Sequence, residues 1–586
     1  MGKQSGLVSC LALLLAVTPA GVSAERCAVI TFDHEWDGNY AANFTSQSEI
    51  PFKGLDALFT FDHPVKSVSN WGGSAEVIDD IHVRMYNDNL FVETGAYCTF
   101  GFQVSYSGDT RPEVIAIDMN GQDACDGTLS WTTTEPYINP CEETGMAPYD
   151  YPQALCMSFL FYEAQRSGVL PPDQRVKPWR WDSALNDGVD VGHDLTGGYY
   201  DAGDHVKFGF PMAVTTTVLA WGLIDFPMGY EQAGQTEYAR AAVKWATDYF
   251  LKAHTAEYEL YGQVGKGSDD HAFWGRPEDM YMKRPAYKIN RENPGTELAC
   301  ETAAALAAAS IVFEGIDDEY SAKLREVAKE LYAFGDEHRL EYHLSITDAE
   351  AFYRSWSGYG DELLWGALWL YRATGDEAYL TKAQEAWDEF SLGEKAEQFS
   401  WDDKKPGAYA LGSMVDSTNT KYAAALKEFL RHVREDSKYT PDGLVFLDVW
   451  GANRHAANVA FLALWASKYG DPADEAINLL WAVSQINYIL GDTGHSFVVG
   501  FGVNPPQRPH HRSSSCPIPP DSCFLNSWGQ TQPGPNPHIL YGALVGGPAE
   551  DGTYEDDRED YVHNEVACDY NAAYTGALAA IIERNN

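Results

Sequence analysis

Basic side chains are scarce in this chain. Its 586 residues include 41 lysines and arginines against 85 aspartates and glutamates, which gives a formal net charge of −44. Nucleic acids and anionic membranes bind basic surfaces that release counterions from phosphate, so the scarcity argues against both as partners. Aromatic residues make up 13% of the chain, and flat rings suit a neutral sugar, whose apolar faces stack on them. Composition leaves open the alternative that these rings only pack a core.

Long apolar runs are lacking beyond the N-terminus. No segment after residue 24 approaches the roughly 18 to 20 uninterrupted apolar residues that a membrane span needs. Residues 1–24 contain a lone Lys3, an apolar run, and the small residues Val22 and Ala24 at the −3 and −1 positions of a cleavage site. This pattern predicts a signal peptide, and we expect a secreted, extracellular protein that does not span a membrane.

Paired cysteines are expected in an exported chain, but their number is odd. Ten cysteines leave nine once Cys10, in the predicted signal peptide, is removed, so not every thiol can pair within the chain. By position, Cys27 is able to pair with Cys125, and Cys516 with Cys523 across a Pro-rich loop.

The composition and the periodicity of the sequence change along the chain. Residues 25–125 contain short β-branched and aromatic runs between Gly, Asn, Asp and Pro, which predicts a β-sandwich. Within them Asn43 begins an N-glycosylation sequon, which predicts an exposed loop. Residues 126–150 have no period and indicate a linker. In residues 151–586, long Ala- and Leu-rich segments with helical period predict roughly eleven or twelve helices, closed into a toroid of helical hairpins.

The densest signal in the helical part is the loop Gly197-Gly198-Tyr199-Tyr200-Asp201-Ala202-Gly203-Asp204-His205. Two aspartates three residues apart on a Gly-containing loop are able to aim at one water. An inverting glycoside hydrolase needs such a carboxylate base to activate water, and a protonated acid on the other face of the sugar. Taken alone, the motif is equally typical of a calcium loop or of a plain turn.

A second constellation runs from Tyr554 to Glu565 and opens the last helix with several carboxylates. Like-charge crowding and partial burial raise the pKa of a carboxyl group toward the value that a general acid needs, although a helix N-terminus opposes this rise. The alternative is a run of acidic residues that complements the helix dipole.

A third constellation is the cluster His510-His511-Arg512 on a Pro-braced loop. It offers fixed donors for sugar hydroxyls or for orienting a carboxylate. The same side chains are able to bind a metal, but no third and fourth ligand follows at metal spacing, so zinc is not expected.

Three stretches, GGYYDAGDHVKFGFP, SFVVGFGVNPPQRPHHR and YEDDREDYVHNEVACDYNAA, together resemble family 9 glycoside hydrolases over essentially all of residues 151–586. The resemblance implies an all-α (α/α)6 barrel behind a small all-β sandwich module, and an inverting endo-β-1,4-glucanase that needs no cofactor for catalysis. It implies Asp204 as the base, Asp201 as its partner in holding the water, and Glu565 as the acid. It also implies Asp556 as a supporting carboxylate. His510 and Arg512 are expected in the site beside the bond that is cut.

Further rings and donors match the cleft of that family, although each taken singly is also compatible with core packing. They are His271, Trp274, Tyr353, Trp356, Trp450, Arg454 and Tyr570.

Another segment resembles the calcium site of some members of the family. Carboxylates and main-chain oxygens suit a hard cation, and we expect a structural calcium there. The alternative is an acidic helix N-terminus. The expected ligands are Ser357, Gly358, Asp361, Glu362 and Asp402.

Residues 25–125 more weakly resemble family 2 carbohydrate-binding modules, through a Cys at each end, Trp36, Trp71 and the run FGFQVSY. Such modules lay exposed Trp rings on crystalline cellulose, so the resemblance implies that Trp36 and Trp71 contact substrate. Near the third ring position this chain has MYNDNLF, without a Trp, and a sandwich that no longer binds is the alternative.

We therefore expect a monomer whose partners are cellulose and related β-glucans. One alternative is the same machinery acting on mixed-linkage glucan or another β-1,4-polysaccharide. An alternative of another class is a non-catalytic carbohydrate-binding protein, which the presence of Asp201, Asp204 and Glu565 disfavours.

Overall fold

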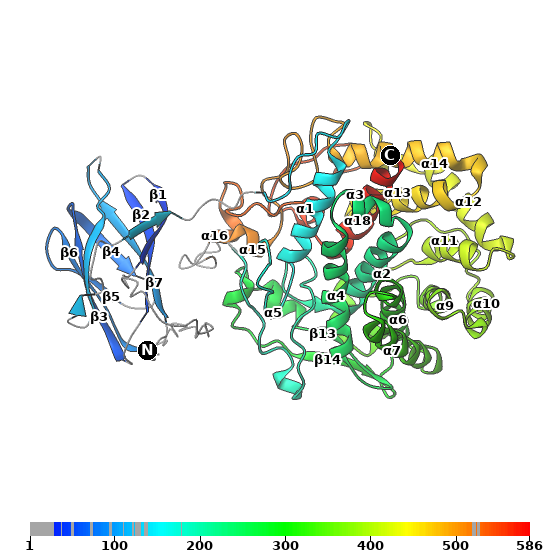
Figure 1. Ribbon diagram of the computed structural model, residues 1–586, viewed down its shortest axis with the longest axis horizontal. Helices are drawn as coiled ribbons and strands as arrows, with labels where there is room; N and C mark the ends of the chain where they lie inside the picture. Colours follow the sequence, from blue (N-terminus) through cyan, green and yellow to red (C-terminus); the bar gives the residue numbers. More distant parts are fainter. Residues whose placement is uncertain are drawn as a thin grey trace. The chain divides into compact units, whose positions relative to one another are not determined.

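The computed structural model divides the chain into two compact units, one within residues 1–136 and one within residues 137–516 and 523–586 (Figure 1). Each unit has a core of its own. The structure describes residues 29–36, 38–47, 52–70, 74–92, 97–108, 110–119, 122–123, 130–133, 139–176, 179–517, 523 and 528–585.

The N-terminal unit is a sandwich of two five-stranded sheets. The first has the order β10 (Ser130–Thr133), β1 (Val29–Trp36), β2 (Asn39–Gln47), β7 (Tyr97–Tyr106), β4 (Val65–Asn70). The second has the order β5 (Ser74–Val77), β6 (His82–Val92), β3 (Phe52–Phe61), β8 (Val114–Met119), β9 (Gln122–Asp123). Alternate side chains form one core, in which Phe59 packs edge-on against Phe44 and Phe102, with ring centroids 5.6 and 5.5 Å apart. The predicted β-sandwich is confirmed.

The C-terminal unit is built around a closed ring of six inner helices. They are α2 (Gly209–Asp225), α6 (Thr296–Phe313), α9 (Gly360–Thr374), α11 (Lys405–Val415), α13 (Ala452–Tyr469) and α18 (Cys568–Arg584). Each contacts the next, and α18 returns to contact α2. Six outer helices cover the ring: α1 (Tyr151–Ala164), α4 (Thr236–Ala253), α7 (Asp318–Glu337), α10 (Glu377–Glu389), α12 (Thr420–Asp436) and α14 (Glu475–Leu490). This is the predicted all-α (α/α)6 barrel.

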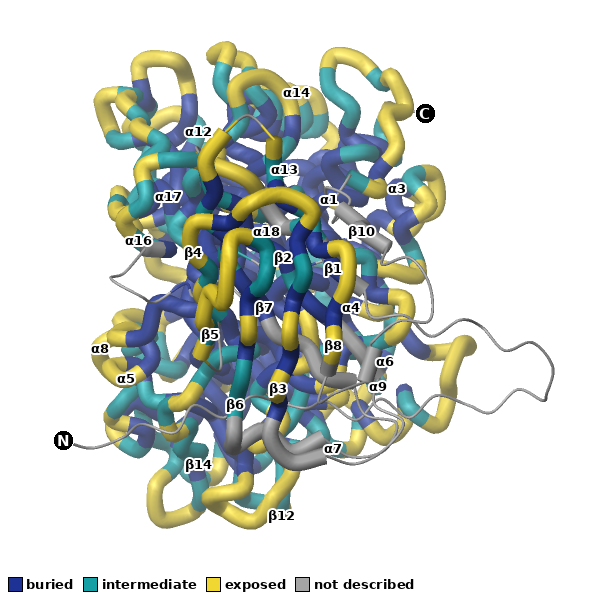
Figure 2. Tube along the Cα trace, turned by 90° about the vertical axis from the view of Figure 1, so that its left-hand side faces the viewer, coloured by how far each residue is buried: buried dark blue, intermediate teal, exposed yellow. Residues whose placement is uncertain are grey.

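The two rings differ in sequence pattern. The inner helix α6 is rich in alanine and buried almost all round, because small side chains allow its neighbours to approach on every side. The outer helix α12 buries one stripe, from Tyr422 through Leu426 and Phe429 to Val433, at the spacing of one helical face. Figure 2 shows buried residues in dark blue in the interior and exposed residues in yellow on turns at the outer edge.

Within the part of the chain that the structure describes, α6 is the one helix long and apolar enough to cross a membrane. Of its 18 residues, Thr296–Phe313, 94% are buried inside the barrel. It is therefore accounted for as a core helix.

The predicted linker, residues 126–150, is wrong at both ends. Its first part contributes β10, which pairs in parallel with β1. Its last part belongs to the barrel unit, where a disulfide joins Cys141 to Cys156 and the Asp150 side chain caps α1. The boundary between the units falls near residue 136. The segment has little periodicity and so resembles a spacer, whereas strand pairing ties in its first part and a disulfide and a side-chain cap tie in its last part.

Other expectations have mixed outcomes. The disulfide Cys516–Cys523 is confirmed. Cys27, Cys125 and the predicted signal peptide lie outside the described residues. The loop predicted at Asn43 is wrong, because this residue lies inside β2 and pairs with β1 on one side and β7 on the other.

Candidate active site

The described part of the barrel unit contains a cavity of about 860 Å³ beside the N-terminal ends of inner helices. Asp201 and Asp204 precede α2, Trp450 precedes α13 and Glu565 precedes α18. Segments far apart in the sequence thus meet at one end of the barrel, because inner helices of this fold run in the same direction.

The structure brings the predicted catalytic and substrate-binding residues of the barrel unit into this cavity, with Asp556 as the exception. The lining includes Asp201, Asp204, His271, Trp274, Tyr353, Trp356, Trp450, Arg454, His510, Arg512, Glu565 and Tyr570. Of the two predicted contacts in the sandwich, Trp36 is exposed at 39% and Trp71 lies outside the described residues.

Asp204 is held as an anion. Its Oδ1 accepts the N–H of Ala202 at 3.2 Å, and Nε2 of His271 lies 3.4 Å from its Oδ2. Burial opposes ionisation, but His271 and the charge of Arg512 outweigh it and hold the pKa of Asp204 below its usual value. The site therefore provides a carboxylate able to take a proton from water.

The loop that carries Asp204 is fixed by a close backbone contact. A Cβ at Gly203 would lie 2.1 Å from the main-chain oxygen of His510, so only glycine fits there. The N–H of Arg512 donates to the main-chain oxygen of Gly203 at 3.0 Å. The GGYYDAGDH loop and the HHR segment thus form one support for the base.

Asp201 has the opposite electrostatic environment. Burial and the neighbouring charge of Asp204 raise the pKa of Asp201 well above its usual value, although the hydroxyl of Tyr353 donates to its Oδ2 at 2.5 Å. One carboxyl of the pair is therefore protonated while the other is ionised. Such a pair offers both a donor and an acceptor to a water held between them.

Glu565 has the character of an acid. Its segment pairs in parallel with His510, whose N–H donates to the main-chain oxygen of Asn564 at 2.8 Å. Burial within the cavity raises the pKa of Glu565 to about 7; the charge of Asp204 acts in the same direction, and a hydrogen bond from Trp450 Nε1 to its Oε2, at 3.1 Å, opposes it. Glu565 is thus able to hold a proton at mildly acidic pH, as the sequence predicts for a general acid.

His510 is neutral in the site. Its Nδ1 donates to the main-chain oxygen of Arg558 at 2.7 Å, and burial lowers the pKa of His510 to about 4. The Nε2 atom is therefore free to accept a hydrogen bond from a sugar hydroxyl. The Trp274 ring lies edge-on to His510, with centroids 5.1 Å apart, and fixes the imidazole.

Asp556, predicted as a supporting carboxylate of the site, does not itself line the cavity, and its part in catalysis stays a prediction. Its carboxylate accepts the N–H groups of Gln507 and Arg508 at 2.8 and 3.0 Å. It therefore supports the loop that leads to His510.

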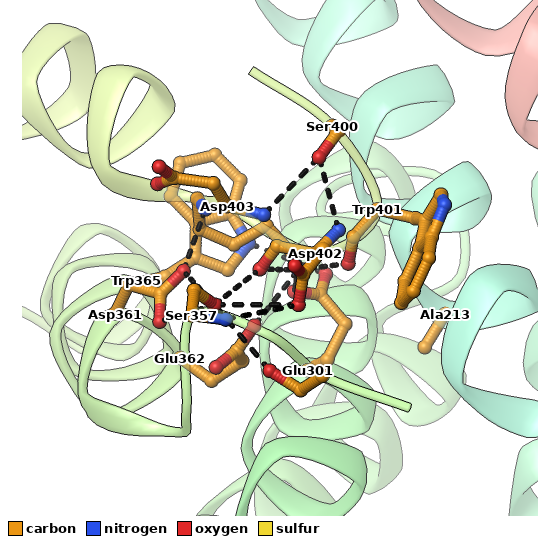
Figure 3. A network of polar contacts seen from close by, with 12 residues as sticks. Ala213, Glu301, Ser357, Asp361, Glu362, Trp365, Ser400, Trp401, Asp402 and Asp403 are labelled. Atoms are coloured by element: carbon orange, nitrogen blue, oxygen red, sulfur yellow. Dashed lines mark hydrogen bonds and ion pairs between the residues drawn. The ribbon is translucent and has the colours of Figure 1, made fainter. Parts of the chain in front are cut away.

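The predicted calcium ligands gather in a buried polar network (Figure 3). Ser357 Oγ lies 3.3 Å from an oxygen of Asp361 and 3.3 Å from one of Asp402. Glu362 forms an ion pair with Lys404 at 2.8 Å, and its Oε2 has no hydrogen-bond partner among the described residues. Hydroxyl, carboxylate and main-chain oxygens are the donors that calcium prefers, so the donor chemistry of Ser357, Asp361 and Asp402 fits this ion. The positive charge of Lys404 counts against Glu362 as a ligand.

In the described residues, one group of His, Cys, Asp or Glu brings three ligand atoms within 4.8 Å of one another: Asp204, Asp270 and His271. Arg512 Nη1 lies 3.6 Å from Asp270, and its positive charge disfavours a metal ion there. We therefore interpret the group as an array of ion pairs and hydrogen bonds around the base.

Sequence reasoning missed several residues of the site, among them Tyr281, whose exposed ring lines the cavity. Two others are Trp401 and Asp270. Trp401, just before α11, lines the cavity and packs edge-on against Tyr353, with centroids 5.0 Å apart. Asp270 is buried beside His271. Their positions, one before an inner helix and one next to a predicted site residue, were the available signals.

A family description, "Glycosyl hydrolase family 9", matches residues 151–578. The chain belongs to this family. It is 48% identical to Endoglucanase B of Cellulomonas fimi, with 74% of this chain and 42% of that protein covered, so it spans less than half of that relative. It is 47% identical to Endoglucanase A of Bacillus pumilus, covering 75% of this chain and 67% of that protein.

Solved structures agree with this membership. An endoglucanase from the termite Nasutitermes takasagoensis matches with a TM-score of 0.73 and 55% identity, over 75% of this chain and all of that one. The cellulase Cel9M of C. cellulolyticum, in complex with cellobiose, matches with a TM-score of 0.69 and 34% identity, again over 75% and 100%. These family 9 chains share the fold of the barrel unit.

Proposed function

We propose that this family 9 protein is an endo-β-1,4-glucanase, which hydrolyses internal bonds of cellulose with inversion at the anomeric carbon. The observation that carries the proposal is one cavity in which Asp204 is held ionised and Glu565 is held protonated. Inverting hydrolysis requires this pair of states. The names of the relatives, and the cellobiose bound to one neighbour, support β-1,4-glucan as the substrate.

In the proposed reaction, Asp204 takes a proton from a water that Asp201 helps to hold. The water oxygen attacks the anomeric carbon while the glycosidic bond breaks and Glu565 gives its proton to the leaving oxygen. A second proton exchange with solvent restores both carboxyl groups. The reaction needs no cofactor for catalysis.

Exposed rings along the cavity support action on internal bonds. Trp356 is 74% exposed, Tyr281 77% and Trp450 43%, and each lines the cavity. Exposed rings offer stacking surfaces to successive sugar units of a chain that lies across the opening.

Proton NMR of the anomeric signals tests the proposal, with purified enzyme and soluble cello-oligosaccharides followed from the earliest time points. Early appearance of the α-anomer is the expected result. Early β-anomer would reject Asp204 as the base that activates water. Product from mixed-linkage glucan or another β-1,4-polysaccharide, without any from cello-oligosaccharides, would reject the substrate and keep the mechanism.

The proposal extends to features outside the reaction. Ser357, Gly358, Asp361, Glu362 and Asp402 would hold a structural calcium, which the unpartnered oxygen of Glu362 and the surrounding oxygen donors support. Because Lys404 already neutralises one oxygen of Glu362, calcium would depend mainly on the other donors.

The remaining parts of the proposal concern the whole protein. The signal-like residues 1–24 support secretion, and the exposed ring of Trp36 supports a sandwich that contacts cellulose as a family 2-like module. The protein would act as a monomer without nucleic acid or membrane partners, as its charge of −44 favours.

A further inference from the structure

Asp270 is a buried carboxylate that the reaction described above does not use. It lies in the short helix α5 (Gly267–His271) and has 0% exposure. Its Oδ1 accepts the N–H of His205, the residue after the base, at 3.1 Å. Arg512 Nη1 lies 3.6 Å from the same oxygen. One side chain therefore contacts both segments that support Asp204.

The second oxygen of Asp270, Oδ2, has no hydrogen-bond partner among the described residues. One oxygen of Asp270, one of Asp204 and a ring nitrogen of His271 all lie within 4.8 Å of one another. The charged groups around Asp270 are Asp204 on the loop, His271 on its own helix, Arg512 on α15 (Arg512–Ser515) and Arg284. His205 is also adjacent, but burial keeps it neutral.

These neighbours shift the ionisation of Asp270 toward neutral pH. Burial, and then the charge of Asp204, raise the pKa of Asp270 to about 6, against the opposing charge of Arg512. Below this pH the group is a neutral acid and above it an anion. The anion helps to hold a proton on His271. Desolvation lowers the pKa of His271, but the charges of Asp204 and Asp270 outweigh it and raise this pKa above its usual value. Protonated His271 is the group that contacts the base at 3.4 Å.

We propose that Asp270 is a positioning residue for hydrolysis: it ties the loop of Asp204 to Arg512 and keeps His271 charged against the base. The inference rests on the proposed glucanase function. Asp270 does not touch the reacting atoms, and it acts through the three groups that set the orientation and charge of Asp204.

The test is the pH dependence of kcat/KM on a soluble cello-oligosaccharide for wild type and Asp270→Asn. The amide oxygen of Asn still accepts the N–H of His205, so the variant removes the charge while keeping the shape. Near pH 5, where Asp270 is protonated and resembles Asn, we expect the two proteins to agree within about 3-fold. Near pH 7 we expect a loss of roughly 10- to 100-fold, because the charge that orients the site is missing.

Asp269→Asn is the matched control. Asp269 lies in the same helix, but its side chain is 47% exposed and pairs with Lys266 at 2.8 Å. We expect the ratio of wild type to this variant to be independent of pH. A pH-independent loss in Asp270→Asn would overturn the proposal, since a residue that only fills space acts equally at every pH.

Two further measurements keep the outcomes distinct. Asp270→Ser removes the same charge with a smaller side chain, and loss of cooperative unfolding in both variants would reject a positioning role in favour of a structural one. An NMR titration of His271 without substrate should give a lower pKa in Asp270→Asn, and an unchanged pKa would also overturn the inference. Wild-type enzyme that is inactive on β-1,4-glucans at every pH would instead reject the proposed function.

Discussion

The separation of acid from base depends on neighbours rather than on residue type. Asp201 and Asp204 are the same residue three positions apart, yet the first has a raised pKa and the second a lowered one. His271 and Arg512 face Asp204, whereas Asp201 has mainly burial and the charge of Asp204 around it. Two neighbouring carboxyl groups that repel each other cannot both ionise easily, so small differences in their surroundings decide which holds the proton.

Trp450→Phe should shift the basic limb of the pH profile. The Trp450 N–H donates to Glu565 and lowers the pKa of this carboxyl, in opposition to burial. Without that hydrogen bond the pKa rises, and the acid stays protonated to higher pH. We expect the basic limb of kcat to move upward by roughly half to one pH unit. Steady-state kinetics between pH 5 and 9 measure it.

Tyr561→Phe is the control for this prediction, because Tyr561 packs against the Trp450 ring, with centroids 5.4 Å apart, and Phe keeps that ring. Its basic limb should stay where the wild type has it. A Trp450→Phe limb that moves downward or not at all would contradict the role given to the indole N–H.

Sequence reasoning reached the carboxylates but not the groups that tune them. The spacing of Asp201 and Asp204, and the acidic run before Glu565, were visible as motifs. Asp270 was not, because its contacts with His205 and Arg512 join positions 65 and 242 residues away, and nothing in the local sequence SDDH separates it from Asp269.

At the scale of elements, periodicity predicted the barrel well and the chain between the units poorly. The composition of a helix such as α6 or α12 predicts whether it lies in the inner or the outer ring, because α6 is apolar on all sides and α12 on one face only. The strand β10 does not, since four residues become a strand only through pairing with β1. The disulfide from Cys141 to Cys156 was missed for a related reason, because spacing alone allows many pairings.

The loop before α9 and the loop before α11 provide a prediction at this scale. If calcium joins them through Ser357 and Asp402, adding calcium should raise Tm by a few degrees over the chelated protein, with the rise depending on calcium concentration. Asp402→Asn should abolish most of this difference, since it removes a charged ligand while keeping an oxygen for the loop N–H groups. Thermal unfolding followed by circular dichroism, with calcium or with EGTA, is the measurement.

The neighbouring variant Asp403→Asn is the comparison for this effect. Asp403 accepts the N–H of Lys405 and pairs with its side chain, outside the proposed ligand set. It should keep the calcium dependence of Tm. Equal Tm values for the wild type in calcium and in EGTA would reject the calcium site.

At the scale of the whole molecule, the sandwich and the barrel have separate cores. The sandwich core is a closed cluster of its own residues, and the barrel ring closes without it. Reaction and surface binding are therefore expected to separate when the chain is cut. The position of the cut matters because the segment before α1, which was predicted to be part of the linker, carries Cys141 and Asp150.

Two truncations test this division. The chain 137–586 keeps Cys141 and the Asp150 cap, and should hydrolyse soluble cello-oligosaccharides like the full protein while losing activity on solid cellulose. The chain 151–586 lacks both and leaves Cys156 unpaired. Loss of a disulfide that closes 15 residues, together with the cap, should lower the free energy of unfolding by about 3 to 4 kcal/mol.

Urea unfolding of the two truncated proteins, with and without reductant, measures this difference. Reduction should remove most of it, because the reduced 137–586 chain also lacks the cross-link and then differs mainly by the Asp150 cap. Equal stability before reduction would mean that residues 137–150 do behave as a spacer. Loss of soluble-substrate activity in 137–586 would mean that the barrel depends on the sandwich, and the two cores would then not be separable units.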